Sequence, residues 1–323
     1  MRLALIKIAL VISKVFLFVG IPFTFLATLW LKLVKKARPG VIEDSIFMSL
    51  GVLPVQDHYY EPMINPKKHL RKSLSDNRAL NGIDLNVKEQ LDLLASFNYN
   101  DELLKFPKEK TANKEYYYNN TSYAAGDSEY YYNLIRKVKP KKIIEVGCGN
   151  STLMAQNAIK KNKEEDSAYF CKHICIEPYE QPWLEQLGID VIRKKVEDVD
   201  LAFFQQLGKD DILFIDSSHM IRAQGDVLFE YLELIPTVKP GVIVHVHDIF
   251  TPKDYPQTWV VDYHLFWNEQ YLLEAFLTNN SQFRIIGALN YLKHNHREAI
   301  EAKCPILASH PEKEPGAFWM VKI

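Results

Sequence analysis

From residue 141 to the end of the chain, short apolar runs alternate with longer amphipathic segments. Runs this short and this apolar predict buried strands, and they fall at 142–146, 173–177, 191–193, 211–216 and 242–248. Two further runs, 283–292 and 317–322, predict the last two strands. Strands that alternate with helical segments are typical of an α/β protein with a doubly wound, mainly parallel sheet.

The N-terminal pattern is different, because residues 15–31 contain no charged side chain. A helix needs about 20 apolar residues to cross a bilayer, and terminal lysines can extend its reach. Lys14 and Lys32 border the run, and Lys35, Lys36 and Arg38 follow it. We therefore expect a single membrane-spanning hydrophobic helix within residues 1–36, with the rest of the chain on the cytoplasmic side. A cleaved signal peptide and an interfacial helix interrupted at Gly20 and Pro22 are the alternatives.

The pattern divides the remaining chain into a preamble and a catalytic domain. Residues 37–122 contain one clear amphipathic helix, over 86–97, and predict a mainly helical cap. Residues 123–323 contain all the predicted strands, preceded by a helix from Asp127 to Val138. We expect this last part to be the functional domain.

Charge and cysteine content limit the possible functions. The net charge of the 323 residues is −1, but the first 40 residues hold seven basic side chains and no acidic one. The remainder has 32 basic and 40 acidic residues, a net charge of −8, which argues against nucleic acid as a partner. The chain has four cysteines and no Cys-x-x-Cys pair. This pattern predicts free, reduced thiols rather than a framework of disulfide bonds.

The segment from Glu145 to Gly149 carries the strongest chemical signal. Gly147, Cys148 and Gly149 form a predicted tight turn between a strand and a helix, and Ser151 can cap the helix start. Such a turn exposes backbone N–H groups to a nucleotide-type ligand. A dinucleotide fingerprint needs a third glycine, and Ser151 stands in its place. A nicotinamide oxidoreductase is therefore the weakest candidate.

Further polar residues follow the ends of the other predicted strands, where ligands bind in doubly wound sheets. Glu177 can accept hydrogen bonds from both hydroxyl groups of a ribose, and Glu197 follows the next strand. Asp216 and Asp248 end adjacent strands, so their carboxylates can share a hard ion such as Mg²⁺. His219 would lie beside that ion as a general base.

The Glu-Val-Gly-Cys-Gly pattern at 145–149 resembles the first motif of class I S-adenosylmethionine-dependent methyltransferases. This resemblance implies a Rossmann-like seven-stranded sheet with an antiparallel last strand. It also implies that Glu145 faces the methionine part of the cofactor, that Glu177 marks its adenosine half, and that Asp127 makes a secondary contact. The cofactor-binding residues expected on these grounds are Glu145, Gly147, Gly149, Ser151, Glu177, Glu197 and Asp127.

A narrower resemblance concerns the metal site. The chain has an Asp-x-x-His pattern at 216–219, after the fourth predicted strand, and the acidic residue Asp248 at the end of the fifth. This combination resembles the metal-dependent sugar and macrolide O-methyltransferases of the macrocin O-methyltransferase and cephalosporin-hydroxylase-like group. It implies Asp216 and Asp248 as ligands and His219 as the catalytic base. The chain departs from that group at His247, where the sugar enzymes have a second carboxylate. Histidine is a poor ligand for Mg²⁺. With His247 as a ligand, the site would therefore hold Mg²⁺ or another divalent metal such as Mn²⁺, Fe²⁺ or Zn²⁺, or it would hold no metal.

These expectations combine into a membrane-anchored, S-adenosylmethionine-dependent O-methyltransferase that acts on a saccharide or another hydroxylated, lipid-linked acceptor. A metal-independent N-methyltransferase is an alternative within the same class. A non-catalytic module that binds adenosylmethionine or another nucleotide is an alternative from a different class.

Overall fold

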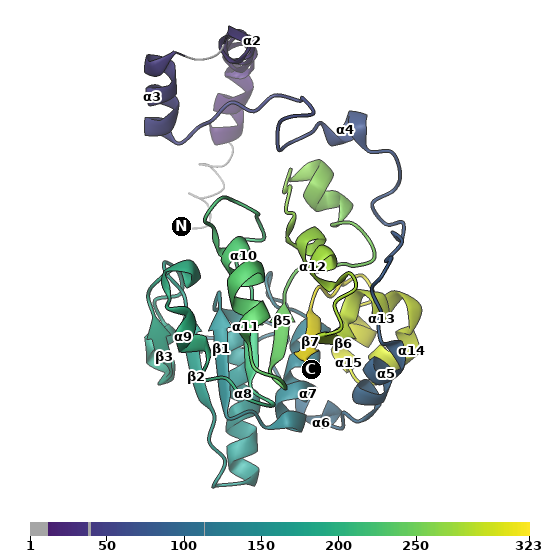
Figure 1. The fold of residues 1–323 in the computed structure, drawn as a ribbon. Helices are drawn as coiled ribbons and strands as arrows, with labels where there is room; N and C mark the ends of the chain where they lie inside the picture. The colour runs from purple at the N-terminus through teal and green to yellow at the C-terminus, as the bar shows by residue number, and fades with distance from the viewer. Residues whose placement is uncertain (1–11, 38–39, 113) are drawn as a thin grey trace. The chain divides into compact units, whose positions relative to one another are not determined.

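The computed structural model describes residues 12–37, 40–112 and 114–323. The chain separates into two units, Met1–Arg71 and Lys72–Ile323 (Figure 1). The first unit contains the helix Ile12–Val19, α2 (Ile21–Ala37), α3 (Val41–Leu50) and the short α4 (Pro66–His69).

The hydrophobic segment of the first unit is broken at Gly20, so the expected single continuous helix is wrong. Helix Ile12–Val19 and α2 meet there at an angle of 51°. Pro22 has no backbone N–H to donate to the preceding turn, which weakens the helix at this point. No single helix among the described residues is both long and apolar enough to cross a membrane, whereas the bent pair taken together has the required length and composition. Residues 1–11 of the expected anchor lie outside the described part.

Polar contacts hold the end of α2 to a later segment of the same unit. The side chain of Gln56 donates to the carbonyl of Lys32 over 3.4 Å, and Lys35 forms a 3.0 Å ion pair with Glu61. The basic end of α2 therefore lies beside the 56–61 segment.

The second unit is built on a seven-stranded sheet of order β3-β2-β1-β4-β5-β7-β6. Strands β1 to β5 pair in parallel, and β7 pairs antiparallel with both β5 and β6. The strands are β1 (Lys142–Val146), β2 (Lys172–Ile176), β3 (Asp190–Ile192), β4 (Ile212–Ile215), β5 (Ile243–Val246), β6 (Phe283–Ala288) and β7 (Phe318–Lys322). The predicted doubly wound, Rossmann-like seven-stranded sheet with its antiparallel closing pair is confirmed.

Helices cover both faces of this sheet (Figure 1). In chain order they are α5 (Val87–Ala95), α6 (Asn100–Leu103), α7 (Asp127–Val138), α8 (Asn150–Glu165), η1 (Leu184–Leu187), η2 (Val196–Asp198), α9 (Leu201–Phe204), α10 (Asp226–Phe229), η3 (Glu230–Leu234), α11 (Ile235–Thr237), η4 (Thr258–Asp262), α12 (Glu269–Leu277), α13 (Leu289–Asn295), α14 (Arg297–Glu301) and α15 (Pro305–Ser309). The π-helical turn η3 lies between α10 and α11, so the three elements follow one another without a break from Asp226 to Thr237.

Strand alternation separates the core into two halves. Ile143 of β1 belongs to the cluster formed with α7, α8 and the C-terminal helices, whereas its neighbour Ile144 belongs to the cluster formed with α9, α11 and α12. Successive side chains of a strand point to opposite faces, so a continuous apolar run buries both. The carboxyl ends of β1, β2, β4 and β5 are left at one edge, where the polar residues lie.

The predicted strand over 283–292 is too long, because β6 ends at Ala288 and α13 begins at Leu289. The strand register shifts between Ile285 and Gly287. At Gly287 an added Cβ would lie 2.7 Å from the hydroxyl oxygen of Tyr130, and that hydroxyl donates to the carbonyl of Ile286 over 2.6 Å. A tyrosine from α7 thus occupies the space beside the strand at the register shift, and the pairing with β7 continues through Gly287 and Ala288.

Candidate functional site

The glycine turn after β1 is locked between the ends of two neighbouring strands. The amide of Gly147 donates to the carbonyl of Ile176 on β2 (3.1 Å), and the amide of Asp216 after β4 donates to the carbonyl of Val146 (2.9 Å). Gly147 has φ +75°, and an added Cβ would lie 1.8 Å from the carbonyl oxygen of Asp216. Only glycine fits both the conformation and the space.

Helix α8 begins directly after this turn. The amide of Gly149 donates to the hydroxyl of Thr152 over 3.0 Å, which caps one of the free N–H groups. The other free amides and the positive end of the helix dipole remain available to a ligand with negative charge or oxygen acceptors.

Two adjoining cavities surround the turn. The first has a volume of about 510 Å³ and the second about 380 Å³, and they share Gly147, Glu177, Glu180 and Asp216 as lining residues. Of the predicted cofactor residues, Gly149 and Ser151 line the first and Glu197 lines the second. The structure therefore brings together five of the seven, namely Gly147, Gly149, Ser151, Glu177 and Glu197.

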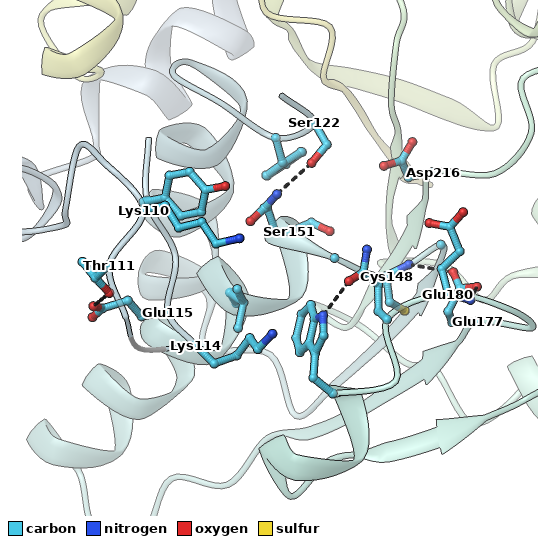
Figure 2. A pocket seen from close by; sticks show the side chains of 18 of the residues that line it. Lys110, Thr111, Lys114, Glu115, Ser122, Cys148, Ser151, Glu177, Glu180 and Asp216 are labelled. Carbon is cyan, nitrogen blue, oxygen red and sulfur yellow. Dashed lines mark hydrogen bonds between the residues drawn. The ribbon is translucent and has the colours of Figure 1, made fainter. Parts of the chain in front are cut away.

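The first cavity has walls of opposite charge (Figure 2). Lys110 and Lys114 lie on one side of it together with a single carboxylate, that of Glu115. Three carboxylates lie on the other side, those of Glu177, Glu180 and Asp216. The ammonium group of Lys114 is 5.1 Å from the ring centre of Trp183, another lining residue. A zwitterionic ligand, with a carboxylate and an amino group, complements such a cavity.

Glu177 is held rigidly at the border between the two cavities. Its Oε1 accepts hydrogen bonds from the amides of Tyr179 and Glu180, each over 2.9 Å, and its Oε2 lies 3.5 Å from the amide of Cys148. The carboxylate is thereby aimed across the glycine turn, the position from which an acidic residue binds a ribose in this type of fold.

Glu145 lines neither cavity, and its expected contact with the cofactor stays a prediction. Strand alternation places its side chain on the same sheet face as Ile143, where it is fully buried. Its carboxylate accepts from the hydroxyl of Ser151 and lies 2.8 Å from Nε2 of His173. Glu145 thus supports the first turn of α8 from behind.

His173 is the charged partner of this buried carboxylate. Burial opposes protonation of the ring, but the sulfur of Cys175 and the carboxylate of Glu145 together outweigh it and raise the pKa of His173 to about 10. The ion pair between His173 and Glu145 is buried on both sides and ties β2 to β1 below the turn.

Asp127 likewise lines neither cavity, and its expected cofactor contact stays a prediction. Its two carboxylate oxygens accept from the amides of Gly316 (3.2 Å) and Ala317 (2.7 Å). Oδ2 of Asp127 is 3.5 Å from Nε2 of His247. Asp127 therefore joins the start of α7 to the segment before β7 and supports the side chain of His247.

Three potential metal ligands gather at the ends of β4 and β5. One ligand atom from each of Asp216, His219 and Asp248 can be chosen so that all lie within 4.8 Å of one another. Nε2 of His219 is 3.4 Å from Oδ1 of Asp216 and 3.4 Å from Oδ2 of Asp248. An imidazole nitrogen with two carboxylates is a donor set suited to a divalent ion.

The other ring nitrogen of His219 is already engaged. Nδ1 lies 2.8 Å from Oε2 of Glu269, a fully buried residue at the start of α12. The hydroxyl of Tyr231 donates to the second oxygen of that carboxylate over 3.2 Å. A carboxylate behind a histidine in this way fixes the ring orientation and directs Nε2 toward the two aspartates.

His247, the third predicted ligand, lies next to this cluster but is not part of it. Its Nδ1 is 3.4 Å from Oδ1 of Asp216 and 3.6 Å from Oδ1 of Asp248. With Asp127 on its opposite side, His247 bridges the two aspartates to α7. His219 therefore occupies the place among the three candidate ligands that the sequence assigns to His247.

Two members of the cluster have backbone conformations that are rare for their residue types. His219 has φ +59° and Asp248 has φ +57°. The carbonyl of His219 accepts from the amides of Asn268 (3.0 Å) and Glu269 (3.3 Å), which holds its loop in place. Left-handed conformations cost a non-glycine residue about 1–2 kcal/mol and concentrate at functional sites.

The surroundings shift the titration of the two carboxylates in opposite directions. Burial raises the pKa of Asp248. Burial acts the same way on Asp216, but His247 and His219 outweigh it and hold the pKa of Asp216 below its usual value. Burial opposes protonation of His219, yet its hydrogen bonds to Asp216 and Glu269 raise the pKa of that ring. The cluster therefore favours positive charge at its centre.

Aromatic side chains border the cluster on the side of the loop that follows β5. The ring of Trp267 lies 4.4 Å from that of His219. Trp259 packs against Trp267 at 5.1 Å and against Tyr255 at 6.4 Å. The loop between β5 and α12 thus brings a partly exposed aromatic surface next to the candidate ion site.

Sequence reasoning missed Glu269, Lys110 and Lys114. Glu269 is 50 residues away from the histidine that it contacts, and in the sequence it is an ordinary acidic residue in the first turn of a helix. The two lysines lie in a segment without periodicity, which gave no signal of a cavity wall.

Comparisons with known proteins support the same region. Residues 144–249, from β1 to the loop after β5, match the family described as "Methyltransferase domain". An uncharacterized protein of Archaeoglobus fulgidus is 32% identical over 180 residues, which cover 51% of this chain and 78% of that protein. A crystal structure described as the O-methyltransferase from Bacillus cereus in complex with SAH aligns with 80% of this chain and 94% of its own, at 11% identity and a TM-score of 0.32.

Proposed function

We propose that the chain is a class I S-adenosylmethionine-dependent methyltransferase and that it methylates a hydroxyl oxygen of its acceptor with the help of a divalent ion. The observation that carries this proposal is the cluster of Asp216, His219 and Asp248. Asp216 lines both cavities around the glycine turn. The cofactor and the ion would therefore meet at the same carboxylate.

The cofactor-binding residues divide into two groups. Gly147 and Gly149 present the backbone to the middle of the ligand, and Glu177 and Glu197 face its nucleoside half from the second cavity. Lys110 and Lys114 offer positive charge to a carboxylate at the opposite end. S-adenosylmethionine supplies the electrophilic methyl group when it is bound. The residues of the chain orient it and exclude water from part of the reaction site.

A divalent ion fits the three-residue cluster by the chemistry of its donors, two carboxylates and one imidazole. Bound there, it would lower the pKa of an acceptor hydroxyl group. Glu269 keeps a proton at Nδ1 of His219, so Nε2 is the ring nitrogen that faces the aspartates. This atom cannot ligate an ion and remove a proton at the same time. We assign Nε2 of His219 the role of metal ligand. The alternative, that His219 is the general base, is one of the outcomes that the test below distinguishes.

The aromatic surface next to the cluster favours a saccharide as the acceptor. Sugar rings present C–H faces that pack on aromatic side chains. The partly exposed Trp267 contacts His219, and the partly exposed Trp259 packs on Trp267. Tyr255 is buried and packs against Trp259. Ring hydroxyl groups would then lie beside the aspartates. The aromatic groups and the oxygen-rich cluster together suit a hydroxylated ring better than an amine.

The test measures binding of adenosylmethionine calorimetrically, then methyl transfer to polysaccharide and lipid-linked sugar extracts with Mg²⁺, Mn²⁺ or a chelator. We expect binding without added ion, and turnover that the chelator abolishes and the ion restores. Asp248→Asn should lower turnover at least 100-fold, whereas Asp262→Asn, at an exposed site, should not. Turnover that survives both chelator and Asp248→Asn would disprove the ion, and methylation of nitrogen would disprove the hydroxyl acceptor.

His219 needs a separate measurement. His219→Ala should weaken binding of Mn²⁺, observed by electron paramagnetic resonance of the free ion. Unchanged ion affinity together with lost turnover would instead identify His219 as the general base. If the wild type does not bind adenosylmethionine, the methyltransferase proposal is wrong. The remaining hypothesis would then be a non-catalytic module that binds another nucleotide.

A further inference from the structure

The first unit exposes large apolar side chains on two separate helical segments. The helix Ile12–Val19 and α2 carry the first group, which is Ile12, Val15, Phe16, Leu17, Phe18, Val19, Ile21, Phe23, Phe25, Leu26, Leu29, Trp30 and Leu33. Isolated exposed apolar residues are ordinary, but an uninterrupted set of this size marks a surface that binds a partner or a membrane.

A second group follows on α3 and the segment after it. Ile42, Ile46, Met48 and Leu50 are each at least half exposed on α3. Val52, Leu53 and Val55 continue the exposed apolar surface. A single membrane-spanning helix would account for the first group only, so any partner of this unit must cover both.

The charge-free part of the apolar segment is short for a single span, although the whole bent pair has the required length when Lys14, Lys32, Lys35 and Lys36 are included. Residues 15–31 would form a straight helix about 25 Å long, and the 51° bend at Gly20 shortens the distance between its ends to about 23 Å. The hydrocarbon core of a bilayer is about 30 Å thick. A bent helix of this length fits within one leaflet more easily than it crosses two.

The charges of the unit favour an anionic surface. Up to Arg71 the chain has ten basic and four acidic side chains. Lys32, Lys35 and Lys36 follow the apolar segment directly, and Lys67, Lys68 and Arg71 lie around α4. Lysine and arginine beside apolar helices are attracted to anionic lipid headgroups.

We propose that the first unit docks on the surface of an anionic lipid bilayer, with the bent helix pair and α3 embedded in a single leaflet. Their apolar side chains lie at the level of the acyl chains, and the basic residues lie at the headgroups. Because both units belong to one chain, this contact holds the second unit at a membrane. The inference is independent of the methyl acceptor and does not rest on the proposed function.

The first test measures flotation of the full chain with vesicles of phosphatidylcholine alone or mixed with phosphatidylglycerol. We expect at least tenfold tighter binding to the anionic vesicles, with part of that gain lost in high salt. Ile46→Asp combined with Met48→Asp should weaken binding at least tenfold. Leu232→Asp, which makes the same type of change at an exposed leucine of the second unit, should leave binding unchanged. Equal binding of all three proteins, or none by the wild type, would overturn the proposal.

A second test distinguishes one leaflet from two. Brominated lipids should quench Trp30 fluorescence strongly when the bromine lies near the headgroups and weakly when it lies near the bilayer centre. The difference between wild type and Trp30→Phe removes the signal of the other tryptophans. A protease added outside the vesicles should remove an N-terminal tag. Protection of the tag would demonstrate a span, and self-association abolished by Ile46→Asp without vesicle binding would assign the surface to a second copy of the chain.

Discussion

Nδ1 of His219 and Oε2 of Glu269 are 2.8 Å apart, a contact that joins the loop after β4 to the first turn of α12. The same helix start donates two backbone N–H groups to the carbonyl of His219. Both the ring and the backbone of His219 are thus oriented from a helix that is distant in the sequence. The position of Nε2 beside the two aspartates depends on this support.

Glu269→Gln should weaken binding of Mn²⁺ or Mg²⁺ by about 10- to 100-fold, the range typical for residues that hold a metal-ligating histidine. The amide keeps the size of the side chain but removes its charge. Calorimetric titration of the ion measures the effect. Glu233→Gln, an exposed position nearby, is the control and should bind the ion as the wild type does. Equal affinity in both variants would show that Glu269 serves stability alone.

Gly147→Ala should destabilise the second unit by more than about 3 kcal/mol, because the methyl group would overlap the Asp216 carbonyl and alanine disfavours the positive φ. Urea unfolding gives the free energy of unfolding. Gly208→Ala meets no atom closer than 3.8 Å and should change stability by less than about 1 kcal/mol. A folded Gly147→Ala protein with normal adenosylmethionine binding would contradict the close approach.

The pair of His173 and Glu145 should make stability depend on pH in the alkaline range. The pKa of His173 in the folded chain is about 10, above its ordinary value of 6.5. The stabilisation from the charged ring is therefore complete below about pH 6.5 and is lost as the pH rises through about 10. Each unit of elevation corresponds to about 1.4 kcal/mol.

The measurement compares the free energy of unfolding of the wild type and His173→Gln between pH 6 and pH 10. The advantage of the wild type should shrink by at least about 1.4 kcal/mol over this range. A constant difference would mean that His173 is neutral in the folded chain.

Arg136→Met should cost about 1.5–3 kcal/mol, the usual range for a hydrogen bond to a charged group, because Arg136 is buried but Glu102 and Glu165 are 20% and 45% exposed. Arg136 is 1% exposed and bonds to Glu102, Glu165 and Asn162, so the change leaves these groups without their donor. Arg297→Met removes an exposed ion pair with Glu301 and should cost less than about 1 kcal/mol. Thermal unfolding of both variants measures the difference. A similar loss of stability in both variants would show that the ion pairs of the buried Arg136 stabilise the fold no more than the exposed pair of Arg297 does.

The sheet could be predicted because each strand carries its own signal. Ile143, Ile144 and Val146 are apolar on both faces, as a strand covered on both sides requires. Gly147 and Glu177 could also be assigned, since strand ends determine where the side chains that follow them gather. These features depend only on neighbours along the chain.

Other features depend on contacts that the sequence pattern does not contain. Glu145 and Val146 are adjacent and both are buried, and only the register of β1 against β2 and β4 decides that the carboxylate lies on the same face as Ile143. Asp127 lies at a helix start, where an aspartate often caps its own helix, yet here it binds the backbone before β7. The contact of Glu269 with His219 likewise arises from the path of the loop between β5 and α12.

Asp216 borders both cavities, and its carbonyl contacts the glycine turn. If the proposed function is correct, the cofactor and the ion would both bind at this residue, and their affinities would then be thermodynamically linked. If the cofactor fixes the Asp216 side chain for an ion, the ion raises the affinity for the cofactor by the same factor. The affinity for the cofactor should therefore be measured both with and without the ion, and the affinity for the ion both with and without the cofactor. The difference between the two values would measure the coupling through Asp216.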